Sequence, residues 1–399
     1  MRHRFFVLLV LAGALSLPLR AAEVKFMTYN VQSPGWNQQR RAQVVATIDA
    51  EAPDVLGLHE ASPFNNGLEL LADLSDDYQA YATDTSDPVY VRLDSALQFV
   101  EQGVFALPVC GGPGGAAVLA WVTLETAAGA RFTFYNSHFC VSFGPQGPTG
   151  NQLQAVAAAE FIAANTTPGD VHLLAGDLNA SQNSATLHFL IDGDPLNING
   201  DLFENPIELD DTWALAPGNA GENHPGTGAG GGQAIIDWIL ANPFVSVLDA
   251  EVIVFEIPPG EEDDYSDHFP VTATLEFGAG GGSGEVPDGD TVPGSQLRAD
   301  RTPQGDLVLA WGRSCLPADI DFHVYQGTLG DFSSHTELAC TTGGSANLVF
   351  TPAIDSSYYL VVPTDGTEEG SYGRWSDGTE RPPGVSACQP QSPTAGCAQ

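Results

Sequence analysis

The stretch that decides the fold is VHLLAGDLNA at residues 171–180, an apolar run that ends in Asp177 and Asn179. The run Val171–Ala175 predicts a buried β-strand. The two polar side chains follow at the point where the strand would meet a loop, and such loops carry functional groups on a rigid scaffold. Because Asp and Asn also cap turns after strands, this stretch alone is compatible with either a site or a turn.

The same placement of polar side chains at or just beyond the end of an apolar run recurs through the first two thirds of the chain. The other instances are TYNV (28–31), LHE (58–60), NSHF (136–139), IDWIL (236–240) and SDHFPV (266–271). A capped turn explains any one of them, but it does not explain the ordered set. In a core of two packed sheets such strand ends meet at one rim, so we expect these residues to form a single site.

The pattern around these motifs predicts strands interleaved with occasional helices. Helices are expected at 37–50 and 152–164, and strands at 24–31, 55–58, 89–93, 96–100, 118–124, 132–139, 171–175, 235–240, 247–255 and 271–277. This mixture indicates an α+β domain in which two packed sheets carry helices on their outer faces.

A change of composition divides the chain. Residues 278–294 read GAGGGSGEVPDGDTVPG, which is typical of a flexible linker. We therefore expect a larger domain at 23–277, a linker at 278–294 and a small module at 295–399. Short β runs at 307–311, 322–325, 348–350 and 358–362 predict a β-sandwich-like, disulfide-stapled module. We expect structural or surface roles for His323 and His335 there.

The amino terminus is typical of an export signal over residues 1–22. Arg2 and Arg4 precede an apolar run from Phe5 to Leu17, and Ala22 closes the segment. An N-terminal strand or anchor is the alternative, but the run is too short to cross ~30 Å of hydrocarbon as a helix. We expect a secreted or periplasmic protein without stable membrane insertion.

Cysteine usage agrees with export, because six cysteines in an exported chain suggest disulfides. Cys110 and Cys140 are a plausible pair. The other four, Cys315, Cys340, Cys388 and Cys397, allow three connectivities, among which the sequence does not choose.

The charge balance is strongly acidic. The chain has 13 Lys+Arg against 50 Asp+Glu, for a net charge of −37, and Lys25 is its single lysine. Residues 23–277 hold 35 of the acids and 5 of the bases. Tight wrapping of nucleic acid depends on many Lys/Arg–phosphate contacts, so this composition argues against it.

Seven residues carry a resemblance to a known family: Asn30, Glu60, Asp177, Asn179, Asp237, Asp267 and His268. Together they resemble the signature of the endonuclease/exonuclease/phosphatase superfamily, which includes pancreatic-type deoxyribonucleases, abasic-site endonucleases, inositol-polyphosphate phosphatases and bacterial sphingomyelinases. The resemblance covers about residues 24–277. It implies a four-layer αββα sandwich and metal-dependent cleavage of a phosphate ester.

The resemblance also implies a metal site. Glu60 is the main expected ligand, with Asn30 and Asp267 near the ion. Oxygen ligands suit Mg²⁺, and Mn²⁺ or Ca²⁺ are the alternatives.

The catalytic roles follow from the same resemblance. Asp177 orients or deprotonates the attacking water, and Asn179 holds the phosphate or that water. His268 contacts the scissile phosphate, and Asp237 fixes its tautomer and raises its pKa. His138 donates a hydrogen bond or proton to the phosphate.

Two departures from the family pattern stand out. His59 occupies a position that is often Gln, and Gly115–Ala117 stand where many members carry a phosphate-clamping arginine. Tyr90 and Arg92, on an earlier strand, are the replacements we expect. With Asn136, which supports His138, they make up the expected substrate-binding residues.

The expected function is an exported, divalent-metal-dependent phosphodiester hydrolase, nuclease-like in the first instance. A sphingomyelinase or phospholipase C-like phosphodiesterase is the enzymatic alternative, although no aromatic-rich loop for a membrane is obvious. The other alternative is a non-catalytic binding protein on the same fold, whose C-terminal module recruits an unknown partner.

Overall fold

A computed structural model describes residues 22–393. Its gaps are 33–36, 62–66, 110–116, 128, 142–146, 167–170, 208, 220–221, 223, 229–233, 243–244, 278–282, 288–291, 293, 317–318, 320, 353–355, 367, 376–377 and 385. The predicted export signal and Cys397 lie outside the described residues. Cys110 does too, so the expected Cys110–Cys140 pair is untested.

The first six-stranded sheet has the order β13-β14-β1-β2-β4-β3. Its strands are β1 (Ala22–Asn30), β2 (Val55–His59), β3 (Tyr78–Tyr81), β4 (Val89–Arg92), β13 (Ser246–Val252) and β14 (Val271–Phe277). The central strands β1 and β2 are parallel. The other neighbours in this sheet are antiparallel.

The second six-stranded sheet has the order β11-β12-β8-β7-β6-β5. Its strands are β5 (Gln98–Ala106), β6 (Val118–Glu125), β7 (Arg131–Ser137), β8 (Val171–Asp177), β11 (Asp210–Asp211) and β12 (Asp237–Ala241). Again the central pair, β7 and β8, is parallel, and the flanking pairs are antiparallel. Both sheets therefore have a central parallel pair of strands flanked by antiparallel strands.

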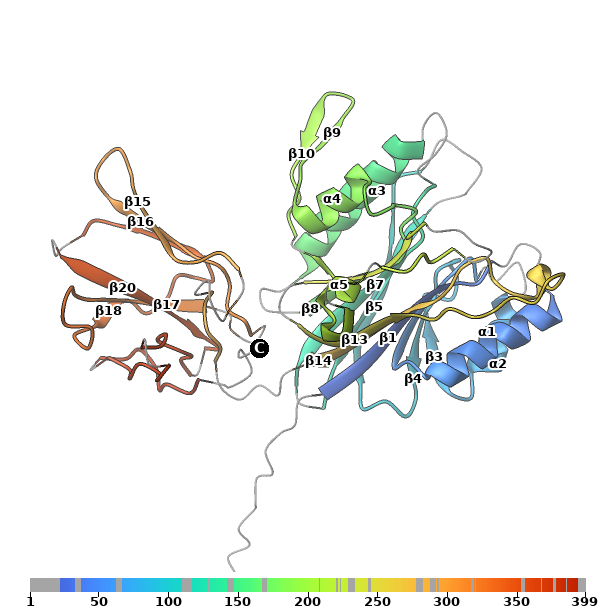
Figure 1. The fold of residues 1–399 in the computed structure, drawn as a ribbon, viewed down its shortest axis with the longest axis horizontal. Helices are drawn as coiled ribbons and strands as arrows, with labels where there is room; N and C mark the ends of the chain where they lie inside the picture. The colour runs from blue at the N-terminus through green and yellow to red at the C-terminus, as the bar shows by residue number, and fades with distance from the viewer. Residues whose placement is uncertain are drawn as a thin grey trace, which may run out of the picture.

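Helices cover the outer face of each sheet, which makes four layers (Figure 1). The helices are α1 (Gln38–Glu51), α2 (Gly67–Leu74), α3 (Gly147–Asn165), α4 (Ala185–Asp192) and the short α5 (Thr212–Leu215), with 3₁₀ turns at Pro217–Asn219 and Glu262–Asp264. Helices α1 and α2 pack on the first sheet, and α3 and α4 pack on the second. A third apolar cluster fills the space between the sheets. The expected αββα sandwich is confirmed.

Local sequence explains why α1 begins and ends where it does. The Asn37 side chain accepts a hydrogen bond from the Arg40 amide at the N-cap, and Val44 and Ile48 are buried on one face. Ala52 takes a left-handed conformation at the C-cap, one residue before Pro53.

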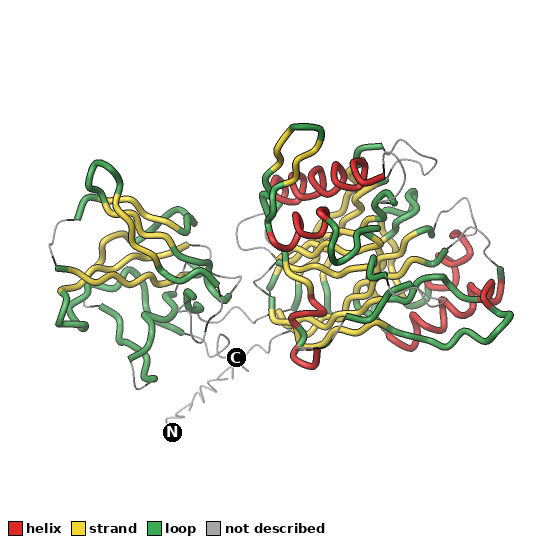
Figure 2. The backbone as a smooth tube through the Cα atoms, turned by 45° about the horizontal axis from the view of Figure 1, so that its top comes forward, coloured by secondary structure: helices red, strands yellow, loops and turns green. Residues whose placement is uncertain are grey.

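The last hundred residues form two three-stranded sheets (Figure 2). Their strands are β15 (Arg298–Arg301), β16 (Leu307–Ala310), β17 (Asp321–Thr328), β18 (Thr336–Ala339), β19 (Asn347–Phe350) and β20 (Ser357–Thr364). Trp311, Phe322 and Val324 are buried between them. A disulfide joins Cys340 to Cys388, and Cys140 and Cys315 are also disulfide-bonded.

Residues 283–284, which lie inside the expected linker at 278–294, make hydrogen bonds to the C-terminal module. Ser283 is fully buried, and its backbone N–H donates to the Ser392 carbonyl at 3.0 Å. The Gly284 amide donates to the Asp319 carboxylate at 2.8 Å. These bonds tie residues 283–284 into the C-terminal module. The domain limits remain predictions, and the contacts favour a module that begins near residue 283 rather than 295.

Other differences concern short or weakly patterned elements. The predicted strand at 96–100 is longer, as β5, and the helices α2 and α4 lie in segments that we did not assign. A hairpin of β9 (Leu196–Ile198) and β10 (Asp201–Phe203) was also not predicted. Within the described residues, no helix is long and apolar enough to span a membrane.

Candidate active site

The predicted site residues gather at one rim because of strand direction. In each sheet the central strands are parallel, so their carboxyl ends share an edge. Those ends carry Asn30, Glu60, His138 and Asp177. The neighbouring antiparallel strand β12 begins at the same edge, with Asp237 opposite Asp177. The expectation of one shared rim therefore holds in the geometry.

Asn30 joins the two carboxylates at the centre of this rim. Its side-chain amide donates to Asp177 Oδ2 at 3.0 Å and lies 3.3 Å from Glu60 Oε1. Its oxygen accepts a hydrogen bond from the Gln32 amide at 3.0 Å. The amide nitrogen, not the oxygen, therefore faces the acids. Asn30 was expected near the ion as a ligand, but in this geometry it positions Glu60 and Asp177.

Asp177 is the residue that the other groups surround. Its side chain is 2% exposed, and its Oδ2 lies 3.4 Å from His138 Nε2 and 3.7 Å from His268 Nε2. The Asn179 amide donates to its Oδ1 at 3.0 Å. The Asn179 side chain donates to the Phe139 carbonyl at 3.0 Å. Asp177 is thus held between two imidazoles at the level of the rim.

Asp237 and His268 form a buried pair beside Asp177. His268 Nδ1 lies 2.8 Å from Asp237 Oδ2, and both side chains are largely buried. Burial disfavours the charged imidazolium, but the carboxylates of Asp237, Asp177 and Asp267 outweigh burial and raise the pKa of His268 to about 10. Burial raises the pKa of Asp237 to about 6, against the effect of His268. At neutral pH this pair is an imidazolium and a carboxylate.

Two hydroxyl side chains that were not among the predicted site residues, Thr227 and Ser266, hold this pair. Thr227 Oγ1 accepts from the Asp237 amide at 3.2 Å, and the Thr227 carbonyl accepts from the Phe269 amide at 2.7 Å. Ser266 Oγ donates to the Asn30 carbonyl at 2.6 Å and accepts from the His268 amide at 3.1 Å. Ser266 lies inside the SDHFPV motif, where it could have been noticed. Thr227 lies in a turn-rich stretch that carries no such signal.

A buried polar connection between the sheets lies beneath the rim. Asn136 is fully buried, and its side-chain amide donates to the carbonyls of Leu58 and Asp87 at 3.0 and 3.1 Å. Its oxygen lies 2.7 Å from His59 Nε2, so His59 is the donor in that bond. Burial lowers the pKa of His59 to about 3, with His138 acting in the same direction, so the ring is neutral.

These contacts correct the expectation for Asn136. A fully buried side chain whose amide and oxygen are both engaged does not touch substrate. Gly57 makes the arrangement possible, because a Cβ at that position would lie 2.1 Å from Asn136 Oδ1. Gly176 is constrained in the same way, since its φ is +148° and a Cβ would lie 1.8 Å from the Ser137 carbonyl oxygen.

The expected roles of Tyr90 and Arg92 are wrong. Strand β4 is antiparallel to β2, with Val91 opposite Val55, so Arg92 lies at the end of the sheet away from the rim. Its guanidinium pairs with Asp54 at 3.0 Å. Tyr90 is buried in the cluster beneath α1 and α2, on the outer face of the sheet. Neither side chain reaches the site.

Asp87 precedes β4 at the rim and was not predicted. It is 1% exposed, and burial raises its pKa to about 7, although His138 acts to lower it. A polar residue just before an antiparallel strand points to the same edge as one just after a parallel strand. That rule could have identified Asp87.

The donor set fits a hard divalent cation. Glu60 and Asp177 turn carboxylate oxygens toward the same amide nitrogen. The Asp267 side chain is 55% exposed, and its Oδ1 lies 3.9 Å from His268 Nε2. Carboxylate oxygens with room for water suit Mg²⁺. Asp177, Asp237 and His268 also lie close enough to share an ion, but Asp237 already holds the His268 Nδ1. Glu60, the main ligand that the sequence predicts, is therefore the better-placed carboxylate for the cation.

Two other described clusters of potential ligands are less suitable. Glu369, His323 and Cys388 lie together in the C-terminal module, but Cys388 is in a disulfide. His188, Asp192 and Asp194 lie at an exposed helix end.

Comparison with known proteins agrees with this architecture. The model of the family described as Endonuclease/Exonuclease/phosphatase family matches residues 27–268. A solved structure of a protein of that family from Bacteroides thetaiotaomicron is 19% identical, with a TM-score of 0.51, over 65% of this chain and 99% of the other. ANGEL2, a 2',3'-cyclic phosphatase, is 14% identical, with a TM-score of 0.50, over 64% and 95%.

A third structure, of an endonuclease/exonuclease/phosphatase from Beutenbergia cavernae DSM 12333, is 18% identical, with a TM-score of 0.47, over 91% of this chain and 98% of the other. No curated protein sequence matches the chain. At these identities the first two likenesses bear on the fold alone.

Proposed function

Because the chain belongs to the Endonuclease/Exonuclease/phosphatase family, we propose that it is an exported, divalent-metal-dependent hydrolase of phosphodiesters. The observation that carries the proposal is the convergence of His138 and His268 on Asp177, which the Asn30 amide joins to Glu60. These residues come from five separate motifs, and their chemistry matches what phosphoester hydrolysis requires.

The carboxylate of Glu60, with Asp267 nearby, would hold the cation. When bound, the cation supplies positive charge against the phosphoryl oxygens. Asn30 keeps Glu60 and Asp177 in register through its shared amide. Asn30 is therefore a positioning residue, and Glu60 is the residue that would contact the cation.

The remaining residues move or hold protons. Asp177 accepts a proton from the attacking water, because its carboxylate oxygen lies within 3.7 Å of the Nε2 atoms of both His138 and His268. His268 stays protonated through its bond to Asp237 and stabilises charge that develops on the phosphate. His138, whose Nε2 lies 3.4 Å from Asp177 Oδ2, donates a hydrogen bond to the phosphate or the leaving oxygen. Asn179 orients the water or the phosphate from its place at the end of β8.

Export is supported by the Cys340–Cys388 disulfide, because disulfides persist in oxidising compartments. The nuclease-like activity and the choline-phosphodiester activity remain the two substrate classes to be separated.

The function is tested with purified protein, Mg²⁺ and three substrates: plasmid DNA, sphingomyelin and bis(p-nitrophenyl) phosphate. We expect hydrolysis that EDTA abolishes and added Mg²⁺ restores. Glu60→Ala and His268→Ala should each lower kcat/KM by about 10³-fold, because each removes a group that acts on the transition state. Asp201→Ala, at the exposed tip of the β9–β10 hairpin, is the matched control and should leave the rate unchanged.

Full activity in either site variant would refute the assignment. No hydrolysis of any substrate, with the fold intact, would favour the non-catalytic binding protein.

A further inference from the structure

We infer that the site acts on phosphodiesters that carry one phosphate and whose two ester substituents are uncharged or cationic, and that it discriminates against nucleic acids. The inference rests on the proposed hydrolase function and names its substrate class. It comes from the positions of the basic side chains in residues 23–277 and of the acidic side chains at the rim.

Three of the five basic residues in this domain lie away from the rim. Lys25 is near the start of β1, Arg92 is at the far end of β4, and Arg131 is the first residue of β7. The rim lies at the other end of the sheets, where β1 and β7 finish. Each of the three is held in an ion pair: Lys25–Glu51 at 2.7 Å, Arg92–Asp54 at 3.0 Å and Arg131–Glu101 at 2.8 Å.

The remaining two basic residues are on α1. Arg41 pairs with Glu69 and Asp73 of α2, in the outer helical layer. Arg40 is 3% exposed and donates to the Gln32 carbonyl at 2.8 Å, so it is beyond the reach of a substrate. Every basic side chain of the domain is therefore either paired with an acid or buried.

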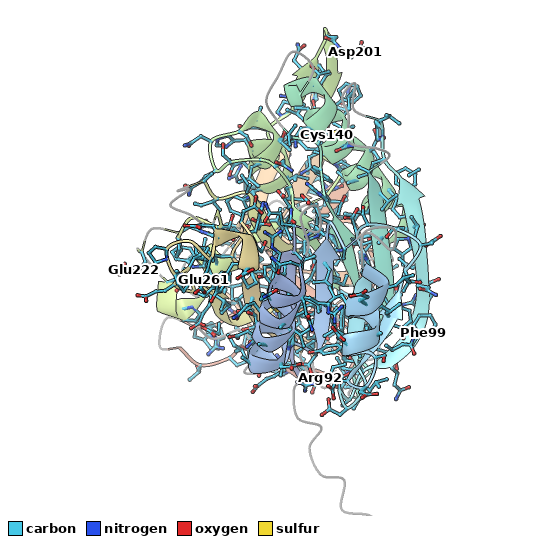
Figure 3. The ribbon with its side chains drawn as sticks, turned by 90° about the vertical axis from the view of Figure 1, so that its right-hand side faces the viewer. Arg92, Phe99, Cys140, Asp201, Glu222 and Glu261 are labelled. Atoms are coloured by element: carbon cyan, nitrogen blue, oxygen red, sulfur yellow. A yellow bond between two sulfur atoms is a disulfide. The ribbon has the colours of Figure 1, made fainter. Side chains whose placement is uncertain are left out.

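Acidic side chains occupy the loop beside the catalytic histidine. Glu261 and Glu262 are exposed, and Asp267 follows within the same loop. Asn37 donates to Asp264 at 2.9 Å, and Ser266 donates to the Asn30 carbonyl, so the later part of this loop is tied to the start of α1 and to the end of β1 at the rim. Figure 3 shows Glu261 on a different side of the domain from Arg92.

This arrangement treats substrates differently according to their charge. The reacting phosphate meets His138, His268 and the cation site. A nucleic acid brings further phosphates to the rim, where they face acids instead of the Lys/Arg contacts that their binding needs. Fields from exposed charges act over about 8 Å at physiological ionic strength, so phosphates adjacent to the scissile bond are repelled. A cationic substituent on the phosphate is attracted by the same field.

A matched pair of substrates isolates the effect of neighbouring phosphates. Dithymidine monophosphate and a decathymidylate contain the same phosphodiester bond, but the second adds charged neighbours. We expect kcat/KM per bond at low salt to be about 10-fold or more higher for the dinucleotide, with the gap closing as NaCl rises. p-Nitrophenyl phosphorylcholine, whose choline is cationic, should lose rate as NaCl rises.

A charge reversal at the rim provides the second measurement. Glu261→Lys should raise kcat/KM for the decathymidylate several-fold and leave the dinucleotide rate unchanged. Asp249→Lys is the control, because Asp249 is exposed on β13 opposite Thr274, level with Lys25 and away from the rim. It should change neither rate.

Preference of the unmodified protein for the decathymidylate at low salt would overturn the inference and leave the hydrolase function standing. Equal effects of the two charge reversals would also overturn it. Hydrolysis of none of these phosphodiesters would refute the proposed function itself, and the inference with it.

Discussion

Asp177 and Asp237 face each other across β8 and β12, yet their surroundings give the two carboxylates different tasks. Asp237 is bonded to His268 Nδ1 and to no solvent, since its side chain is 1% exposed. Asp177 accepts from Asn30 and from the Asn179 amide and lies between the Nε2 atoms of two histidines. Asp237 therefore holds His268 at Nδ1, whereas Asp177 lies beside the Nε2 atoms of both His138 and His268.

The first prediction concerns Asp237→Asn. This change keeps the shape of the side chain but removes the charge that favours the imidazolium. It also replaces an acceptor-only carboxylate by an amide that can donate to Nδ1, so the tautomer of His268 is no longer fixed. We expect kcat to fall by about 10²–10⁴-fold, with KM and the thermal midpoint little changed, when initial rates are measured over a range of substrate concentrations.

Asp249→Asn, on the exposed edge strand β13, is the control for loss of one negative charge. A rate for Asp237→Asn equal to that of the control would contradict the role of the pair.

At the scale of elements, the two sheets are joined beneath the rim through His59 and Asn136. The Asn136 side-chain amide on β7 donates a hydrogen bond to the carbonyl of Leu58 in β2. Its oxygen accepts a hydrogen bond from His59 Nε2. Glu60 follows His59 directly and takes a positive φ of 56°. The bond between the strands therefore sets where the chain turns to present Glu60.

The second prediction compares two replacements of His59. His59→Leu leaves the Asn136 oxygen buried without a donor and should cost about 1–3 kcal/mol of stability, together with weaker Mg²⁺ activation. His59→Gln keeps an N–H donor and should retain most of both. Urea unfolding and Mg²⁺ titration of the rate are the measurements.

Leu68→Gln, an exposed position on α2, controls for substitution as such. If His59→Leu proved as stable as the unmodified protein, the bond would not join the sheets in an energetically significant way.

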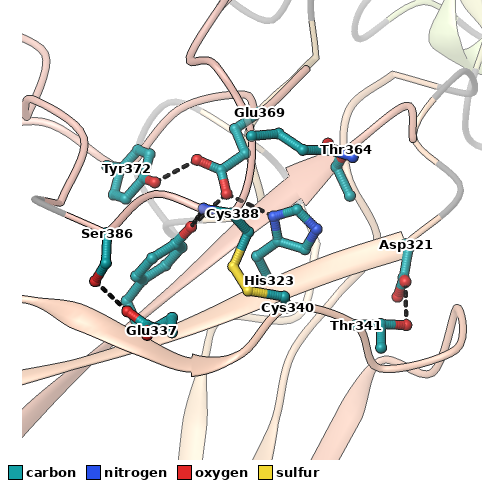
Figure 4. The surroundings of a disulfide bond; sticks show 12 residues. Asp321, His323, Glu337, Cys340, Thr341, Thr364, Glu369, Tyr372, Ser386 and Cys388 are labelled. Atoms are coloured by element: carbon teal, nitrogen blue, oxygen red, sulfur yellow. Dashed lines mark hydrogen bonds and ion pairs between the residues drawn. A yellow bond between two sulfur atoms is a disulfide. The ribbon is translucent and has the colours of Figure 1, made fainter. Parts of the chain in front are cut away.

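At the scale of the whole molecule, the C-terminal module has its own buried polar centre (Figure 4). The Glu369 carboxylate is fully buried and accepts hydrogen bonds from the hydroxyls of Tyr325 and Tyr372. His323 Nδ1 lies 2.5 Å from the same carboxylate. The nearby Cys388 amide donates to the Tyr325 oxygen at 2.8 Å, which ties the disulfide to this centre.

The third prediction concerns pH and this centre. Burial alone would raise the pKa of Glu369, but the bonds from His323, Tyr325 and Tyr372 outweigh it and lower the pKa below its usual 4.5. The ionised carboxylate therefore stabilises the module above the unfolded pKa, and this contribution is lost as pH falls through the lower folded pKa. Calorimetry should show the module losing thermal stability on acidification below about pH 4.5.

Glu369→Gln should cost about 3 kcal/mol at pH 7 and make the thermal midpoint less dependent on pH in the acid range. Glu368→Gln is the matched control on the neighbouring residue. An unchanged acid dependence in Glu369→Gln would contradict the role of this carboxylate.

The sequence by itself determined the sandwich and most of the rim. Apolar runs of strand length end in Asn30, Glu60, His138 or Asp177. Such a pattern involves only neighbouring residues, so it can be recognised without knowing how the rest of the chain packs. Parallel central strands then bring those ends together. The long helices α1 and α3 were predictable for the same reason, whereas α2, α4 and the β9–β10 hairpin are too short for their patterns to stand out.

Only the tertiary structure decided which side chains face the rim. Tyr90 and Arg92 have suitable chemistry, but neither side chain reaches the rim. The direction of β4 places Arg92 at the opposite end of the sheet, and the alternation of faces places Tyr90 on the outer face. Both depend on how β4 pairs with its neighbours, which the sequence of one strand does not show. Asn136 and His59 are 77 positions apart, so their bond depends on how the sheets stack. Pairing of distant groups requires register and burial, and both are fixed only when the whole chain packs.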